Sequence, residues 1–403
     1  MELLPRAITE RLQMALRRFP VVGIVGPRQV GKTTLVREQL FVGRADVRFL
    51  DLENPRDRRL LDEPYDYLES LSGLTVVIDE VQLMPELFAL LRPLVDADRR
   101  PGRFVLLGSA SPRLMRDASE SLAGRIQYTE LAPISRVELG ARTDDVRTDD
   151  ARTDDGRTGG ERHWLRGGYP DALLAADASA SYDWREAYLR TYVTRELPAL
   201  GSVGQPETLR RLLRMLAAQQ GDLFNQSAYA RSLGISQPSV RSYVDLLTQS
   251  FLVAQLPPYH ANVRKRLVKT PKVYVRDAGL LHVLNRIEDA GQLRDSLIVG
   301  ASWEGYVVEQ VRAVVSNRAE LFFYRTAAGA EIDLVIVGRR GRVACVEVKF
   351  SSAPALTRGF YNAREDVAPE RTYVVGLTAE RYSRAGGVAV LGLDEALAEL
   401  TGW

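Results

Sequence analysis

A stretch near the amino end has the residue types and the spacing of a phosphate-binding loop, G-x-x-x-x-G-K-[ST]. It consists of Gly26, Pro27, Arg28, Gln29, Val30, Gly31, Lys32 and Thr33, and Thr34 follows it. The glycines let backbone N–H groups curl around phosphate oxygens, and the start of the following helix adds positive potential. We expect Lys32 to reach the β- and γ-phosphates of a nucleoside triphosphate and Thr33 to hold a Mg²⁺ ion.

Two carboxylates, Asp79 and Glu80, follow the apolar stretch 74–78. Open α/β sheets bind ligands at the carboxyl ends of their strands, so both side chains are expected beside the phosphates. Asp79 would hold Mg²⁺ through water, and Glu80 would orient and deprotonate the water that attacks during hydrolysis. A helix cap at Asp79 with a solvated neighbour is the structural alternative, and the phosphate-binding loop upstream favours the catalytic interpretation.

Small polar residues follow a further apolar stretch, Phe104–Gly108. Ser109 or Ser111 could touch the γ-phosphate or its attacking water and so sense the state of the nucleotide. A turn and cap before a helix at Pro112 would use the same residues, and both interpretations stay open.

A second set of residues with chemical potential lies toward the carboxyl end. Residues 329–349 are predicted to form a hairpin with its turn at 339–341. Glu347 and Lys349 stand two apart on one strand and share a face, and Asp333 on the neighbouring strand can meet them. An exposed, ion-paired hairpin is the alternative interpretation.

A helix predicted from Ser302 to Val314 carries two further carboxylates, Glu304 and Glu309. Two or three carboxylates and a lysine on one face are what metal-assisted phosphodiester hydrolysis needs. Carboxylate oxygens suit Mg²⁺, and the metal would activate water and stabilise the charged transition state. Lys349 would position the nucleophile or neutralise the phosphate.

The elements that must position the first set alternate along the chain. A helix is predicted at Ile8–Arg18 and another at Thr33–Leu40. The predicted strands are Val21–Val25, Val47–Leu52, Leu74–Asp79, Phe104–Gly108 and Ile126–Leu131. This alternation predicts an α/β domain with a parallel sheet covered by helices on both faces.

Composition bounds the class of protein. The chain has 403 residues, enough for two to four domains, and a net charge of +2, which does not indicate a nucleic-acid binder in bulk. Its one cysteine, Cys345, is expected in the core, and the three histidines lack the spacing of zinc ligands. We find no apolar run long enough to span a bilayer and no signal-peptide pattern, so a cytoplasmic protein without membrane contact is expected.

Residues 140–160 differ from their surroundings, because Arg-Thr-Asp-Asp recurs there with a period of five. Such a segment cannot bury a core, and we interpret 141–160 as a low-complexity linker. A functional acidic–basic tract is the alternative.

Helical patterns follow this segment. A helix is predicted at Tyr182–Leu200, within a helical, lid-like segment. The order of predicted elements beyond it is that of a winged helix-turn-helix. Helices are predicted at Leu212–Gln219, Asn225–Leu233 and Pro238–Ser250, and a basic two-stranded wing is predicted at Phe251–Arg276. This part either binds DNA or acts as a packing module between domains.

The carboxyl-terminal motif, Asp333 with Glu347-Val348-Lys349, resembles that of the PD-(D/E)XK nuclease superfamily. The whole chain resembles prokaryotic AAA-type P-loop ATPases whose C-terminal half is a domain of unknown function with a winged helix and a nuclease-like fold. The resemblance implies ATP as the nucleotide and Arg125 as a contact to the γ-phosphate, in cis or from a neighbouring subunit. It also favours Glu304, in the pair Trp303-Glu304, over Glu309.

The sequence therefore predicts an α/β P-loop ATPase domain, then a helical and winged-helix part, then a PD-(D/E)XK-like α/β domain. The predicted bounds are 1–140 for the ATPase core, 141–160 for the linker, 161–210 for the lid-like segment, 211–277 for the winged helix-turn-helix and 278–403 for the nuclease-like domain.

The function predicted from the sequence is that of an ATP-binding, Mg²⁺-dependent ATPase coupled to a DNA-binding or nuclease-like C-terminal domain. The alternative is a nucleotide-controlled switch or scaffold whose nuclease-like domain is catalytically inactive and binds DNA or a protein partner. ATP and Mg²⁺ are the expected cofactors. DNA, a protein partner and further copies of the chain stay open as partners.

Overall fold

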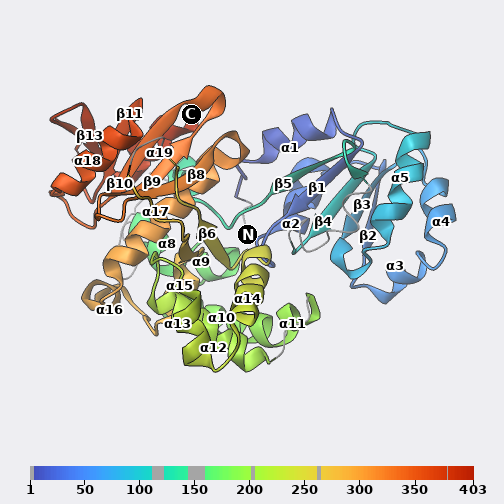
Figure 1. Ribbon diagram of the computed structural model, residues 1–403. Helices are drawn as coiled ribbons and strands as arrows, with labels where there is room; N and C mark the ends of the chain where they lie inside the picture. The colour runs from blue at the N-terminus through green and yellow to red at the C-terminus, as the bar shows by residue number, and fades with distance from the viewer. Residues whose placement is uncertain (1–3, 111–121, 144–158, 201–204, 261–264, 379) are drawn as a thin grey trace. The chain divides into compact units, whose positions relative to one another are not determined.

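The computed structural model describes residues 4–110, 122–143, 159–200, 205–260, 265–378 and 380–403 (Figure 1). Within these residues the chain forms two compact units. Unit 1 comprises Met1–Ile134 with Gln249–Phe251, and unit 2 comprises Ser135–Thr248 with Leu252–Trp403. Ser111, the helix expected at Pro112 and most of the predicted linker lie outside the described residues.

Unit 1 is built on a parallel sheet whose strands run in the order β2-β3-β4-β1-β5. The strands are β1 (Val21–Val25), β2 (Val47–Asp51), β3 (Thr75–Asp79), β4 (Phe104–Gly108) and β5 (Ile126–Glu130). These bounds agree with the predicted strands to within one residue at each end. Every residue of β1 and β4 is buried, as a strand covered on both faces requires.

The described helices of unit 1 lie between these strands in the chain, apart from α1, which precedes β1. They are α1 (Thr9–Leu16), α2 (Lys32–Leu35), the π-helix η1 (Val36–Leu40), α3 (Pro55–Arg59), α4 (Pro64–Ser70), the 3₁₀ turn η2 (Val81–Leu83) and α5 (Leu87–Ala97). Leu68 of α4 and Leu91 of α5 share one hydrophobic core with strand residues such as Ile78 and Leu106. The predicted alternation of strand and helix, and the parallel sheet, are confirmed.

The first half of unit 2 is helical. It contains α7 (Arg136–Thr143), α8 (Gly159–Arg166), α9 (Pro170–Leu173), α10 (Ala178–Thr191), η4 (Tyr192–Glu196), α11 (Leu197–Leu200), α12 (Pro206–Ala218), α13 (Gln226–Leu233) and α14 (Gln237–Gln249). The helix predicted at Tyr182–Leu200 corresponds to α10, η4 and α11. An antiparallel pair follows α14, formed by β6 (Val253–Leu256) and β7 (Lys272–Val275).

The second half of unit 2 is organised around a mixed sheet in the order β12-β13-β11-β10-β9-β8. Its strands are β8 (Glu320–Arg325), β9 (Glu331–Val337), β10 (Val343–Val348), β11 (Arg371–Val375), β12 (Tyr382–Arg384) and β13 (Val388–Leu391). β9 and β10 form the predicted hairpin, with the 3₁₀ turn η6 (Arg339–Gly341) between them, and β11 then pairs in parallel with β10.

The helices of this half are α15 (Ala278–Leu284), α16 (Ala290–Asp295), α17 (Val299–Val315), the turn η5 (Ser316–Arg318), α18 (Arg358–Val367) and α19 (Leu393–Thr401). α17 and α19 cover one face of the sheet and α18 covers the other, whereas α15 and α16 pack against α17 and α8. Alternate residues of β9 face opposite cores: Leu334 packs with α17 and α19, whereas Val335 packs with α18. Cys345 is fully buried in the second of these cores, as expected.

The segment between β6 and β7, the two strands of the predicted wing, pairs with strand β8. Tyr259 N–H donates to Phe323 O at 2.6 Å, and Val268 N–H donates to Arg325 O at 3.0 Å. β8 is the edge strand of its sheet, so its outer backbone groups need partners, and this segment supplies them. Residues on either side of the predicted boundary at 277 therefore belong to one compact unit.

In the part of the chain that the structure describes, no helix has both the length and the apolar character needed to cross a membrane.

Candidate nucleotide site and carboxylate cluster

The phosphate-binding loop connects β1 to α2, and its two glycines are required by the backbone. Gly26 has a φ of 156°, and a Cβ there would lie 2.2 Å from Leu131 O. Gly31 has a φ of 90° in the left-handed region, where it precedes the first helical residue. Other residue types are strained or excluded at both positions, so the local geometry explains this part of the motif.

Lys32 lies inside the loop and is only 6 % exposed. Its Nζ donates to Gly26 O at 3.0 Å and to Pro27 O at 2.8 Å. Burial lowers the pKa of Lys32 to about 8, although the nearby Glu80 and Asp79 carboxylates act to raise it. A poorly hydrated ammonium held between loop carbonyls is a strong donor for the oxygens of an anionic ligand.

Thr33 and Asp79 meet at the carboxyl ends of β1 and β3. Thr33 Oγ1 donates to Asp79 Oδ2 at 2.6 Å, and burial raises the pKa of the Asp79 carboxyl. An adjacent hydroxyl and carboxylate are the oxygen ligands that Mg²⁺ takes beside substrate phosphates. This part of the site fits the metal that a P-loop ATPase uses.

Glu80 and Ser109 are brought together, as the sequence predicts for a hydrolytic site. Ser109 Oγ lies 3.3 Å from Glu80 Oε2. Glu80 adopts a left-handed backbone conformation, with φ 55° and ψ 42°, which is uncommon for a residue with a side chain. Backbone strain of this kind often accompanies functional sites.

Gln82 joins these two residues and was not identified from the sequence. Its Nε2 donates to Glu80 Oε2 and, at 2.9 Å, to Ser109 Oγ, while its Oε1 accepts from Ser109 N–H at 3.3 Å. The one signal in the sequence is an amide two residues after the carboxylate.

The other loop residues have different surroundings. Arg28 pairs with Glu53 at 2.6 Å, Gln29 has a φ of 62°, and Thr34 is exposed. Val30 is buried, and its carbonyl accepts from Arg6 Nη1 at 2.9 Å. Arg6, in the segment before α1, was not identified from the sequence, and its guanidinium holds the loop through this hydrogen bond.

Arg125 is not brought to the phosphate-binding loop within one chain. Val21 N–H, at the start of β1, donates to Arg125 O, whereas the loop follows Val25 at the other end of that strand. A strand rises about 3.3 Å per residue, so the length of β1 separates them. Arg125 instead pairs with Asp96 through two contacts of 2.8 Å, which lower the pKa of Asp96 to about 2.

The predicted carboxyl-terminal residues also converge, on one face of the β9–β10 hairpin. Asp333 Oδ2 accepts from Val348 N–H at 2.9 Å, and Lys349 Nζ lies 2.6 Å from Glu347 Oε1. Glu304 of α17 lies at the same place, where Tyr274 donates its hydroxyl proton to Glu304 Oε1 at 2.6 Å. Glu309 points elsewhere and pairs with Arg276 and Arg312, each at 2.8 Å.

Lys272 lies between these carboxylates and is only 4 % exposed. Its Nζ is 3.1 Å from Glu304 Oε1, 2.8 Å from Glu331 Oε1 and 3.8 Å from Asp333 Oδ1. Lys272 was counted from the sequence among the basic residues of the wing; it does lie on strand β7 of that pair, but its side chain is buried against carboxylates. The signal available was its spacing from Tyr274, which puts both on one face of β7.

The charges in this cluster shift one another's pKa values. Burial, together with Asp333, raises the pKa of Glu347 to about 8 and also raises that of Glu304. Burial alone would lower the pKa of Lys272, but Glu304, Tyr274, Asp333 and Glu331 outweigh it and hold that pKa well above its ordinary value. Lys272 is therefore a permanent cation at neutral pH.

The cluster does not fit a divalent metal. Among the described residues, no group of three or more His, Cys, Asp or Glu side chains is arranged to hold a metal ion. One oxygen of each of these carboxylates already meets a lysine ammonium group, a tyrosine hydroxyl or a backbone N–H.

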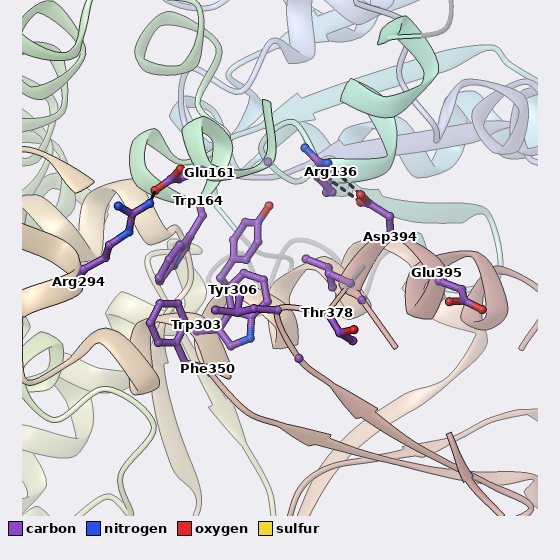
Figure 2. Close-up of a pocket in the computed structure, with 15 residues that line it drawn as sticks. Arg136, Glu161, Trp164, Arg294, Trp303, Tyr306, Phe350, Thr378, Asp394 and Glu395 are labelled. Carbon is purple, nitrogen blue, oxygen red and sulfur yellow. Dashed lines mark hydrogen bonds and ion pairs between the residues drawn. The ribbon is translucent and has the colours of Figure 1, made fainter. Parts of the chain in front are cut away.

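A separate cavity of about 530 Å³ lies elsewhere in unit 2 (Figure 2). Its aromatic lining consists of Trp164, Trp303, Tyr306 and Phe350. Figure 2 shows Arg136 joined to Asp394 at its rim, where the two form an ion pair of 2.8 Å. None of the predicted site residues lines this cavity.

Comparison with known protein families divides the chain into three parts. Residues 18–140 match the AAA domain family, residues 158–291 match a domain of unknown function, DUF8612, and residues 299–396 match a second domain of unknown function, DUF4143. Lys32, Asp79, Glu80 and Ser109 fall in the first part. The carboxylates of the cluster fall in the last, whereas Lys272 comes from the middle part.

Two uncharacterized mycobacterial proteins, one of Mycobacterium bovis and one of Mycobacterium tuberculosis, are each 41% identical to the chain over 393 residues. The alignments cover 97% of this chain and 84% of each relative. Among solved structures, the Walker-type ATPase PABY2304 of Pyrococcus abyssi is 16% identical, with a TM-score of 0.46 over 70% of this chain and 96% of that one.

Proposed function

Because this chain belongs to the same family as the two mycobacterial proteins and carries an AAA domain, we propose that it binds ATP with Mg²⁺ and hydrolyses it. The observation that carries this proposal is the convergence of side chains at the carboxyl ends of β1, β3 and β4. Lys32, the pair Thr33–Asp79, and the trio Glu80, Gln82 and Ser109 all lie there.

Each residue has a distinct part in the proposed reaction. Thr33 and Asp79 would hold Mg²⁺, which neutralises charge on the phosphates. Lys32 donates to the β- and γ-phosphate oxygens in place of its present loop carbonyls. Glu80 takes the proton of the attacking water, and Gln82 and Ser109 keep its carboxylate in place.

Arg125, if it contacts the γ-phosphate, acts from a neighbouring copy of the chain. Its position at the amino end of β5 supports this version of the prediction over the version in cis. An Arg125→Ala variant should then lose turnover without losing ATP affinity. The same variant mixed with Glu80→Gln should recover turnover, because each protein supplies the residue that the other lacks.

For unit 2 we propose the switch or scaffold rather than an active nuclease. The order helix α17, hairpin β8–β9–β10, helix α18 and parallel strand β11 supports a PD-(D/E)XK-like fold. A fold of this kind does not itself imply activity. Lys272, which is not part of the nuclease-like motif, pairs with Glu304 and Glu331, and this pairing supports an inactive, partner-binding domain.

The helices α12–α14 with β6 and β7 fit a winged helix-turn-helix that serves for packing. Of its basic residues, Lys265 pairs with Asp366 at 2.7 Å and Lys272 is buried in the cluster. These pairs leave less positive charge for phosphate contacts than the sequence suggested, which disfavours DNA binding through the wing.

An active nuclease is the second candidate. It is favoured by Glu347 Oε2, a buried oxygen for which no hydrogen-bond partner exists among the described residues.

The test incubates the purified chain with supercoiled and linear DNA, with Mg²⁺ or Mn²⁺, and with or without ATP, next to Lys349→Ala. We expect intact DNA and measurable ATP turnover that disappears in Lys32→Ala. Cleavage by the wild type that Lys349→Ala abolishes would establish the nuclease instead. Absence of ATP turnover in the wild type would remove the ATPase proposal.

A further inference from the structure

Lys272 contacts two of the carboxylates that the sequence predicts as metal ligands, Glu304 and Asp333. It reaches the cluster from β7, while its partners come from α17 and β9. Its Nζ lies within 4 Å of Glu304, Glu331 and Asp333. A single side chain thus contacts carboxylates contributed by two other elements.

A divalent metal and this ammonium would compete for the same oxygens of Glu304 and Asp333. Mg²⁺ needs its oxygen ligands at about 2.0–2.1 Å in a near-octahedral arrangement. A metal held by Glu304 and Asp333 would lie within a few ångströms of Lys272 Nζ, where two cations in a poorly solvated place repel strongly. The metal therefore requires that Lys272 leave.

Other protein groups donate to the same carboxylates. Tyr274 donates to the Glu304 oxygen that Lys272 also contacts, and Val348 N–H donates to Asp333 Oδ2. Lys349 takes Glu347 Oε1. Protein donors thus meet at least one oxygen of each of the four carboxylates, whereas Glu347 Oε2 is buried without a hydrogen-bond partner among the described residues.

We infer that the ammonium of Lys272 is the resident cation of this cluster, that it excludes divalent metals, and that it clamps β7 onto α17 and β9. The inference rests on the proposed function in one respect, since it explains why the nuclease-like domain is inactive. It goes further by assigning the cause to one residue, which lies outside the family-matched part that contains the carboxylates.

The experiment measures Mn²⁺ binding to the full chain by calorimetry and by the electron paramagnetic resonance signal of free Mn²⁺. All proteins carry Asp79→Asn, so that the nucleotide site contributes no metal ligand pair. We expect no bound Mn²⁺ in this parent and one bound Mn²⁺ per chain after adding Lys272→Met. Adding Asp333→Asn as well should abolish that binding.

Three results would overturn the inference. The first is that the parent, with Lys272 intact, binds Mn²⁺ and loses this binding when Asp333→Asn is added. The second is that the folded Lys272→Met protein binds no Mn²⁺. The third is that Lys272→Arg, which keeps the positive charge, binds Mn²⁺ as Lys272→Met does. These readings are independent of ATP turnover. DNA cleavage by the wild type would refute the inactive domain, whereas Mn²⁺ binding without cleavage would refute only the role of Lys272.

The clamp has its own test if Lys272→Met folds poorly. Loss of Lys272 leaves Glu304 and its neighbours without their cation, so this single variant should have a clearly lowered melting temperature. Lys272→Met combined with Glu304→Gln should recover part of the loss, because both charges are then gone. Purely additive losses would show that the two residues do not act as a pair and would contradict the clamp.

Discussion

The buried histidine His282 makes unit 2 sensitive to mild acid. The ring is 0 % exposed, with Nδ1 2.9 Å from Leu165 O and Nε2 2.7 Å from Ser302 Oγ. A carbonyl oxygen can only accept, so Nδ1 carries the proton and Nε2 accepts from the Ser302 hydroxyl. Trp164 Nε1–H in turn donates to Ser302 Oγ at 3.0 Å, which fixes this direction.

The size of the effect follows from the pKa of His282. Burial lowers this pKa from its ordinary value of 6.5 to about 3. Between these two values the unfolded chain binds the proton and the folded chain does not, so stability rises with pH across the window and is lost as the pH falls. From about pH 7.5 down to about pH 5 the free energy of unfolding should fall by about 2 kcal/mol through this residue alone.

The tryptophans provide an assay that is confined to unit 2. All four lie within its bounds, at positions Trp164, Trp184, Trp303 and Trp403. Urea unfolding followed by tryptophan fluorescence therefore reports the unit that contains His282. The wild type is compared with His282→Asn, whose amide can still donate to Leu165 O but does not titrate in this range.

The difference between the two proteins isolates the histidine. Glu347 contributes a pH dependence of opposite sign, since its pKa is raised to about 8, and this contribution is common to both proteins. His282→Asn should be less stable than the wild type at neutral pH and should lack the 2 kcal/mol loss toward about pH 5. The exposed His260 offers a matched control, because His260→Asn should keep the full loss. Equal losses in the wild type and in His282→Asn would refute the reasoning.

Three further predictions concern the two sites. Gln82→Ala removes an amide donor from the Glu80 carboxylate. Since such hydrogen bonds contribute about 1.5–3 kcal/mol, kcat for ATP should fall about 10- to 100-fold at unchanged KM. An unchanged kcat would contradict the positioning role. Gly26→Ala places a Cβ 2.2 Å from Leu131 O. Equilibrium binding of a fluorescent ATP analogue should be lost, while the circular dichroism spectrum stays that of the folded protein. Retained binding would count against the described loop. Glu347 keeps its proton more tightly in the folded state, so its contribution to stability declines as pH rises from about 4.5 to about 8. The melting temperature of Glu347→Gln should therefore fall less than that of the wild type over this range. Parallel curves of melting temperature against pH would exclude the raised pKa.

The strands of unit 1 could be predicted because buried parallel strands consist of uninterrupted apolar residues. The loop motif then indicated where the phosphates belong, and the direction of the strands placed Asp79, Glu80 and Ser109 at the same edge. The direction of β5 likewise puts Arg125 at the opposite edge of the sheet. Arg125 precedes its strand, whereas the loop follows β1.

Lys272 could not be predicted in this way. A lysine in a basic stretch is normally solvated, and its partners Glu304 and Glu331 lie 32 and 59 positions further along the chain. Only the packing of β7 against α17 and β9 brings them together. Gln82 could not be predicted for a different reason. It lies only two residues after Glu80 in the sequence, but its amide has a role only because the fold brings Ser109 next to Glu80.

The central claim is that unit 1 hydrolyses ATP with Glu80 as the base, and one pair of measurements on Glu80→Gln tests it most directly. Equilibrium ATP binding and steady-state turnover are measured on the same protein with Mg²⁺, next to wild type and Lys32→Ala. Glu80→Gln should bind ATP about as tightly as the wild type, while its turnover falls about 100-fold or more. Wild-type turnover in Glu80→Gln would contradict the account.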